Sequence, residues 1–159
     1  MKHTTLLFLL RDNEILLAMK KRGFGMDRWN GVGGKIEPGE TILEAAAREC
    51  HEEIGVQPGE LEKVGHLTFT FPDGTADILS HVFVTRQWEG EPIETEEMAP
   101  QWFSLSDIPY KEMWQDDQYW LPHVLDGKKL VASFMFTQDE KMVPGENKIT
   151  IVGEVPDAV

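Results

Sequence analysis

The sequence predicts an α/β protein built on a mixed β-sheet with helices on both sides. Three observations support this class. Short segments rich in Val, Ile, Thr and Phe recur along the chain, two segments between them have helical patterning, and no repeat, low-complexity tract or linker divides the 159 residues. With 41% hydrophobic residues the chain can bury a core, and domains of about 100–200 residues are common. We therefore expect residues 1–159 to form a single domain.

Two neighbouring strands are expected at the amino terminus, over residues 4–10 and 14–19. The polar Arg11-Asp12-Asn13 between them suits the turn of a hairpin. The apolar start imitates a short signal peptide, but charged residues interrupt it from Arg11 onwards and no small-residue cleavage site follows. We interpret it as a buried first strand.

The most clearly predicted element is a helix that follows a glycine-rich loop at residues 23–34. Thr41 is a typical N-cap residue, and Glu44, three residues later, completes a capping box. Gly55 ends the helix at the C′ position. One face of the helix is apolar, and an acidic face lies about 120° away from it. The apolar face consists of Leu43, Ala46, Ala47, Cys50 and Ile54.

The remaining elements follow from local signals of the same kind. Residues 64–71 and 78–88 are rich in Val, Thr, Phe and Ile, and Pro72-Asp73-Gly74 between them is typical of a turn, so a second hairpin is expected. A short strand is expected at residues 101–103 and a second helix at 116–125, before Gly127. Two further strands are expected at residues 130–136 and 149–152.

The composition limits the partners. The chain carries 28 Asp and Glu against 15 Lys and Arg, a formal net charge of −13. A protein that covers nucleic-acid phosphates needs a basic face, so we expect no nucleic-acid partner, and a phosphate ligand would need metal ions. The single Cys50 suits a reducing compartment. No apolar run reaches the roughly 18 residues of a membrane span, so we expect a cytoplasmic protein with no membrane partner, and a monomer by default.

Three carboxylates, those of Glu49, Glu52 and Glu53, share the acidic helix face. Like-charge pairs at this spacing destabilise a helix by about 0.2–0.5 kcal/mol, and a bound divalent cation reverses that sign. Carboxylate oxygens suit Mg²⁺, with Mn²⁺ possible. A solvated acidic face is the alternative for a bare ExxEE pattern. The preceding glycine loop favours the metal site, and we expect Arg48 to tether the loop's acids rather than neutralise this face.

The loop and the helix together match a family pattern. Gly34, Glu40 and the run RECHEEIGV at residues 48–56 fill every fixed position of the Nudix box, and the chain therefore resembles the Nudix hydrolases. The resemblance implies the Nudix fold, a mixed sheet sandwiched between helices (α/β/α), and Mg²⁺-dependent hydrolysis of a nucleoside diphosphate linked to another group. The metal ligands that it implies are the backbone oxygen of Gly33 and the side chains of Glu49, Glu52, Glu53 and Glu97.

The same resemblance implies that these four glutamates, with Arg48, are the catalytic residues. Either Glu53 or Glu97 can act as the general base. We predict Glu53, because its position in the box is unambiguous. Glu97 has the alternative reading of one acid among many in residues 89–97.

Three segments outside the box indicate the substrate. Residues 19–35, 96–114 and 113–120 resemble Nudix enzymes that hydrolyse oxidised purine nucleoside triphosphates, and this likeness runs from about residue 4 to residue 136. It implies hydrolysis of 8-oxo-dGTP and 2-hydroxy-dATP to the monophosphate and pyrophosphate, which sanitises the nucleotide pool. The substrate-binding residues that it implies are Thr5, Lys20, Phe24, Asn30, Gly33, Gly34, Lys35, Phe69, Phe71, Ile78, Met98, Trp114, Asp116, Asp117 and Trp120.

The segment MWQDDQYW at residues 113–120 has a physical reading of its own. Trp114 and Trp120 offer a flat wall for a purine, and base–aromatic stacking is worth about 1–3 kcal/mol. Asp116 and Asp117 should hold one proton between them, so that one donates and the other accepts a hydrogen bond at the base edge. The alternative is that both Trp side chains are core anchors and the Asp pair caps the following helix.

The sequence departs from the family pattern at three places. Gln115 stands where Pro is usual, the turn at residues 72–77 differs, and the tail from Thr137 does not align. Two other functions therefore stay open. One is a Nudix pyrophosphatase for another nucleotide, such as a methylated purine triphosphate, a nucleotide sugar or a dinucleoside polyphosphate. The other is a Nudix-fold sensor that binds a nucleotide without cleaving it.

Overall fold

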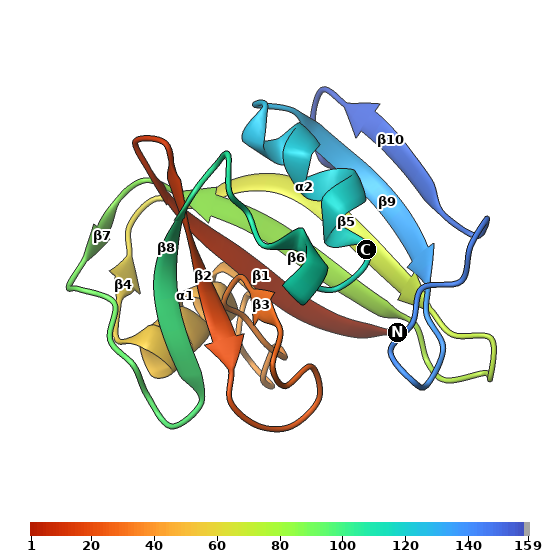
Figure 1. Cartoon of the computed structure of the whole chain (residues 1–159), viewed down its shortest axis with the longest axis horizontal. Helices are drawn as coiled ribbons and strands as arrows, with labels where there is room; N and C mark the ends of the chain where they lie inside the picture. The colour runs from red at the N-terminus through yellow and green to blue at the C-terminus, as the bar shows by residue number, and fades with distance from the viewer. Residues whose placement is uncertain (158–159) are drawn as a thin grey trace.

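The structure, a computed structural model, describes residues 1–157 and is organised around a mixed eight-stranded sheet. The strands of this sheet are β1 (Lys2–Arg11), β2 (Glu14–Lys20), β3 (Trp29–Asn30), β5 (Glu62–Thr70), β6 (Ile78–Thr85), β8 (Met98–Ser104), β9 (Lys129–Met135) and β10 (Lys148–Val152). Their order is β10-β9-β5-β6-β1-β2-β3, and β8 also pairs with β2. Two helices, α1 (Ile42–Ile54) and α2 (Asp117–Leu125), lie on opposite faces of the sheet (Figure 1). The predicted α/β class is confirmed.

β1 supplies both sides of the core, because successive side chains of a strand point to opposite faces. Leu7 and Leu9 pack in the same cluster as Ile54 of α1, whereas Phe8 packs with Trp120 of α2. The strand also runs parallel to β6, so it is enclosed within the sheet as well as on both faces. The interpretation of the apolar start as a buried strand is confirmed.

The glycine-rich loop enters the sheet where β1 and β2 separate. These strands pair only near their hairpin, and farther along β1 pairs instead with Val32 and Lys35 of the loop. A Cβ atom on Gly33 would lie 1.9 Å from the carbonyl oxygen of Thr5, and one on Gly31 would lie 2.8 Å from that of Leu7. Only glycine permits this approach, so the loop is held rigidly against the central strand.

The caps predicted for α1 are confirmed. The Thr41 hydroxyl accepts from the Glu44 N–H at 3.1 Å, the Glu44 carboxylate accepts from the Thr41 N–H at 3.0 Å, and Gly55 adopts φ 73°. The predicted apolar face is wrong at Leu43, which is exposed because it lies in the first turn and lines only a shallow groove. Glu53, on the predicted acidic face, is buried.

Most other predicted elements are present with shifted ends. The 78–88 strand stops at Thr85, whose hydroxyl donates to the carbonyl groups of Glu60 and Gln87 and turns the chain. The chain then forms β7 (Trp88–Glu89), which pairs with β4 (Gln57–Pro58), and later η1 (Tyr110–Glu112). None of the helices within residues 1–157 has the length and apolar character needed to cross a membrane.

Candidate active site

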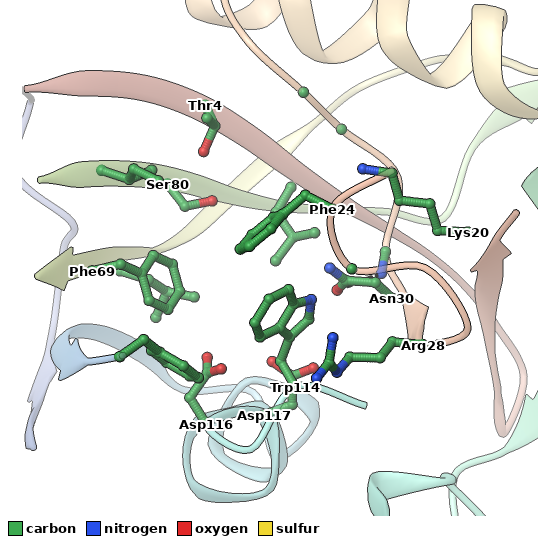
Figure 2. Close-up of a pocket in the computed structure, with 18 of the residues that line it drawn as sticks. Thr4, Lys20, Phe24, Arg28, Asn30, Phe69, Ser80, Trp114, Asp116 and Asp117 are labelled. Carbon is green, nitrogen blue, oxygen red and sulfur yellow. Dashed lines mark hydrogen bonds between the residues drawn. The ribbon is translucent and has the colours of Figure 1, made fainter. Parts of the chain in front are cut away.

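A cavity of about 520 Å³ opens on the side of the sheet that carries α2. Its walls come from β1, β5, β6, the glycine loop and the segment before α2 (Figure 2). This volume lies within the range of about 300–1,000 Å³ that is usual for sites of small ligands. The residues predicted to bind substrate that line it are Thr5, Lys20, Phe24, Asn30, Gly33, Gly34, Lys35, Phe69, Phe71, Ile78, Met98, Trp114, Asp116 and Asp117.

Trp114 forms the largest flat surface that lines this cavity, and its indole lies near the middle of the view in Figure 2. Its ring centroid is 5.1 Å from that of Phe24 and 5.6 Å from that of Phe136. The guanidinium carbon of Arg28 lies 4.3 Å from the Trp114 ring centroid. A planar aromatic ring held in this way can stack on a nucleobase.

Asp116 and Asp117 line the same cavity, yet they are only 2% and 3% exposed. Burial raises the pKa of Asp116 to about 6, and burial together with the charge of Asp116 raises the pKa of Asp117 well above its usual value. The indole N–H of Trp120 donates to Asp116 at 2.8 Å and stabilises its ionised form, whereas Asp117 Oδ2 has no partner within residues 1–157. Asp117 is therefore the member that holds the shared proton and offers a donor.

Trp120 has a different role from the one predicted. It is fully buried in the core against Phe8, and it does not line the cavity. Its predicted function as a second wall is replaced by support of Asp116 from behind, because α2 turns its indole toward the sheet. The helix-cap alternative for the aspartates does not hold, because Asp116 makes no side-chain capping bond to α2.

The acidic face of α1 approaches the glycine loop from the other side. A Cβ atom on Gly34 would lie 2.7 Å from the carboxyl carbon of Glu49, so glycine is what allows this contact. Glu53 is 7% exposed, and its Oε2 has no hydrogen-bond partner within residues 1–157. Burial, followed by the interaction with Glu49, raises the pKa of Glu53 to about 9, while the backbone N–H of Gly33 and the charge of Lys20 act in the opposite direction.

Arg48 joins the loop to the helix. Its guanidinium donates to Glu40 at 2.6 and 3.0 Å and to the carbonyl oxygen of Lys35 at 3.1 Å, which confirms that it tethers the loop. It also donates to Glu49 at 2.9 Å and to Glu52 at 3.1 Å. The expectation that Arg48 leaves the acidic face alone is therefore wrong, because the side chain is long enough to span both.

The side chain of Glu97 points to a different partner from these carboxylates, although its backbone is linked to Glu53. Its carboxylate pairs with Arg22 and is 47% exposed. Thr95 holds this segment against α1, since its hydroxyl donates to the Glu53 carbonyl oxygen at 2.8 Å and accepts from the Glu97 N–H at 3.3 Å. Among residues 1–157, no group of three or more Asp, Glu, His or Cys side chains is arranged to hold a metal ion.

The donors at this face nevertheless suit a hard divalent cation. They are carboxylate oxygens beside a backbone turn, one of them, on Glu53, is buried without a partner, and the neighbouring Glu49 contributes to the raised pKa of Glu53. A cation beside Glu49 and Glu53 would replace the missing hydrogen bond and favour both ionised forms. Arg22 and, less strongly, Lys20 lower the pKa of Glu97, and the charge of Lys20 also acts against the rise in the pKa of Glu53. Lys20 lines the cavity, so the acidic face adjoins it.

Comparison with known proteins places the chain in a family. Residues 1–124 match the model of the NUDIX domain. The chain belongs to the Nudix family. The predicted family is thereby confirmed, and the chain is a Nudix hydrolase, a class that generally needs divalent metal ions.

Several relatives are similar over most of the Nudix chain. It is 46% identical over 140 residues to the oxidized purine nucleoside triphosphate hydrolase of Mus musculus, which covers 87% of this chain and 88% of that protein. It is 42% identical to the protein of the same name from Danio rerio, over 97% of both chains. The crystal structure of the MutT protein from Bacillus halodurans aligns with a TM-score of 0.83 at 25% identity, covering 94% of this chain and 97% of that one. The predicted Nudix fold is confirmed.

The sequence did not predict every residue that lines the cavity, and the unpredicted ones include Arg28, Thr137 and Glu140. Arg28 lies inside the 19–35 segment, so its place beside the predicted Asn30 was a usable signal. Thr137 and Glu140 follow residue 136, where the resemblance ends. No local pattern marks them, because they reach the cavity only through the fold.

Proposed function

We propose that this Nudix hydrolase converts oxidised purine nucleoside triphosphates, 8-oxo-dGTP and 2-hydroxy-dATP, to the monophosphate and pyrophosphate with Mg²⁺, and so sanitises the nucleotide pool. The observation that carries the proposal is the sealed Asp116–Asp117 pair beside the Trp114 ring in one cavity. Relatives from Mus musculus and Danio rerio that are named for this substrate class support it.

The base site reads a purine by stacking and by hydrogen bonds. Trp114 covers one face of the base. Protonated Asp117 donates and ionised Asp116 accepts, so the pair matches an edge on which donors and acceptors alternate. Asn30, whose side chain accepts from the Gly31 N–H at 2.8 Å, contributes its amide group to the same site. Oxidation changes the donor and acceptor pattern of a purine, and buried polar groups discriminate strongly against a mismatched pattern.

The phosphates lie toward the glycine loop and the acidic face. The proposed ligands of Mg²⁺, or of Mn²⁺ in its place, are Glu49, Glu52, Glu53, Glu97 and the backbone oxygen of Gly33. When bound, the cation neutralises the triphosphate and lowers the pKa of a coordinated water. Glu53, with a pKa of about 9 in the absence of a cation, becomes a base only with a positive charge beside it. Glu53 then takes the proton of the attacking water.

We also propose that residues 1–159 act as one domain, as a cytoplasmic monomer, on free nucleotides rather than on nucleic acid or membranes. The formal net charge of −13 supports the absence of a nucleic-acid partner. The single Cys50 is buried and suits a reducing compartment. Light scattering, a single urea transition and cell fractionation test the three parts of this assignment.

A nucleotide panel tests the substrate. We expect kcat/KM with Mg²⁺ to be about 10- to 100-fold higher for 8-oxo-dGTP or 2-hydroxy-dATP than for dGTP, because the site reads the altered edge. The panel includes O6-methyl-dGTP, ATP, ADP-ribose and a dinucleoside polyphosphate, each with and without Mg²⁺ and Mn²⁺. Preference for any of these last four would assign a different Nudix substrate. Binding without release of pyrophosphate or monophosphate would identify a nucleotide sensor.

A further inference from the structure

The end wall of the cavity comes from the segment between β9 and β10, residues 137–142, which we call the 137–142 loop. Thr137 and Glu140 of this loop line the cavity. Hydrogen bonds fasten the loop at two points: Gln138 donates to Asp73, and the Gln115 side chain accepts from the Met142 N–H at 2.6 Å. The three places where the sequence departs from its family pattern therefore meet at one wall of the base site.

A third tie connects this loop to the base-stacking ring. Arg28 donates to the Glu140 carboxylate at 2.6 Å, and the side chains of the pair are 28% and 29% exposed. The same guanidinium lies 4.3 Å from the centroid of Trp114 (Figure 2). An arginine held by a carboxylate at one end and an aromatic face at the other has a fixed plane, which a lysine would not provide.

The backbone conformation of Glu140 is unfavourable for a glutamate, which indicates that the position requires its carboxylate. The residue adopts φ 64°, a left-handed conformation that is uncommon outside glycine, asparagine and aspartate. Glycine would fit this turn with less strain. The glutamate at this position supplies the carboxylate that Arg28 requires.

Trp114 has little freedom on its other sides. A Cβ atom on Gly25 would lie 3.2 Å from the indole, and Phe24 and Phe136 pack at 5.1 and 5.6 Å between ring centroids. The Arg28 guanidinium completes these contacts, and its displacement would leave its side of the ring uncovered. The orientation of Trp114 depends on Arg28, and through it on the 137–142 loop.

We propose that Arg28 and Glu140 are positioning residues that clamp Trp114, so that the 137–142 loop sets the geometry of the base site and its selectivity among purines. The identity of the base rests on the proposed function, whereas the clamp itself does not. Neither side chain needs to touch the reacting atoms. Their effect should therefore appear in substrate binding and base selectivity rather than in the chemical step.

The kinetic test compares Glu140→Gln, Glu140→Gly and Arg28→Lys with a matched control elsewhere. Arg11 makes the same arrangement with Glu14, at 3.2 Å, and with Trp102, at 3.8 Å, outside the cavity, so Glu14→Gln is the control. We expect each clamp variant to raise KM about 5- to 20-fold with kcat within about twofold, since this is the scale of a partly desolvated cation–π contact. The ratio of kcat/KM for oxidised over normal purine should fall by a similar factor.

A double variant shows whether the two residues act as one unit. If Glu140 works through Arg28, Glu140→Gln combined with Arg28→Lys should raise KM no more than the larger single change. Glu140→Gly relieves the left-handed backbone, so its loss of binding cannot be attributed to a strained turn. Additive increases in KM, or increases of less than about twofold in all variants, would overturn the clamp.

A spectroscopic readout separates this proposal from the proposed function. The five tryptophans can be labelled with 5-fluorotryptophan, and the Trp114 and Trp102 signals assigned with Trp114→Phe and Trp102→Phe. We expect Glu140→Gln to shift or broaden the Trp114 signal and leave that of Trp102 unchanged, and Glu14→Gln to do the reverse. An unchanged Trp114 signal would refute the clamp even if oxidised purines are hydrolysed. If the panel identifies another substrate, the kinetic test uses that nucleotide, and only the assignment of the base fails.

Discussion

Two pairs of carboxylates lie at the active site, and each contains at least one buried member. Glu49 and Glu53 come from α1, and Asp116 and Asp117 come from the start of α2. In each pair burial raises a pKa, to about 9 for Glu53 and to about 6 for Asp116. Each pair also contains one oxygen without a hydrogen-bond partner within residues 1–157. The local charge state is therefore similar, and the difference lies in the surroundings.

The surroundings determine what each pair binds. The aspartates are sealed among core side chains and receive a neutral N–H from Trp120, so a single proton satisfies them. The glutamates lie beside a glycine loop, with exposed Glu52 next to them and Arg48 on one side. This second pair has further oxygen donors beside it, in Glu52 and the glycine loop, and a divalent cation requires several such ligands. The same residue type thus serves base recognition at one end of the substrate and phosphate chemistry at the other.

The largest expected effect tests the glutamate pair, which we expect to bind the cation. Glu53→Gln should lower kcat about 10²- to 10⁴-fold, because the amide cannot take a proton from water. The metal-free variant should be at least as stable as the parent, since it no longer places a carboxylate next to Glu49. Turnover with Mg²⁺ and thermal unfolding with and without Mg²⁺ measure the two parts.

The exposed Glu112 on η1 provides a control for this change. Glu112→Gln alters charge by the same amount at an exposed residue that does not line the cavity, and it should leave kcat and the Mg²⁺-induced rise in Tm unchanged. Near-normal turnover of Glu53→Gln would transfer the role of base to Glu97. A large loss in Glu112→Gln would mean that net charge, rather than the pair, controls activity.

The next effect tests the aspartate pair, which we expect to share a proton. Asp117→Asn keeps a donor but cannot exchange a proton with Asp116, so the pair can no longer adjust its donor and acceptor pattern to two different base edges. We expect the ratio of kcat/KM for 8-oxo-dGTP over 2-hydroxy-dATP to change about tenfold, which corresponds to one hydrogen bond of about 1.4 kcal/mol. The comparison needs both substrates at one pH. An unchanged ratio would show that the aspartates do not read the base.

Much of this arrangement follows from local sequence signals. The helix caps at Thr41 and Gly55 and both hairpins depend on neighbours in the chain, and these predictions agree with the structure. The proton predicted to be shared by Asp116 and Asp117 has the same local origin. The family box also places the acidic face beside the glycine loop. Residues within one helix or turn are positioned by its geometry, which is the same in every protein.

The predictions that failed depend on distant segments. The segment 113–120 and the family resemblance predict Trp120 as a wall of the base site, but the packing of α2 turns it into the core. Arg48 reaches both the loop and the acidic face, a choice that only the three-dimensional distances decide. Glu140 lies 112 residues from its partner Arg28, so no spacing rule connects them.

The smallest expected effect concerns stability, and it tests whether the aspartate pair holds a proton where the glutamate pair binds a cation. Because the folded pKa of Asp116 is about 6 and its usual value is 3.8, folded protein holds a proton that unfolded protein has released between these pH values. This contribution to the unfolding free energy is complete below about pH 4 and is lost as pH rises through about 6. Asp116→Asn removes it. The unfolding free energy of Asp116→Asn relative to the parent should therefore rise by about 1–2 kcal/mol between pH 4.5 and 7.

The comparison must be made as a difference between the two proteins. Burial lowers the pKa of His66 and of His81 to about 4, so these groups make stability rise with pH over the same interval and oppose the aspartate in each single curve. Their effect is common to both proteins and cancels. Asp126→Asn, at the exposed end of the same helix, is the matched control and should give a flat difference in urea unfolding without metal. A flat difference for Asp116→Asn as well would mean that folded Asp116 holds no proton that unfolded protein has released at pH 4.5, and the contrast with the glutamates would fail.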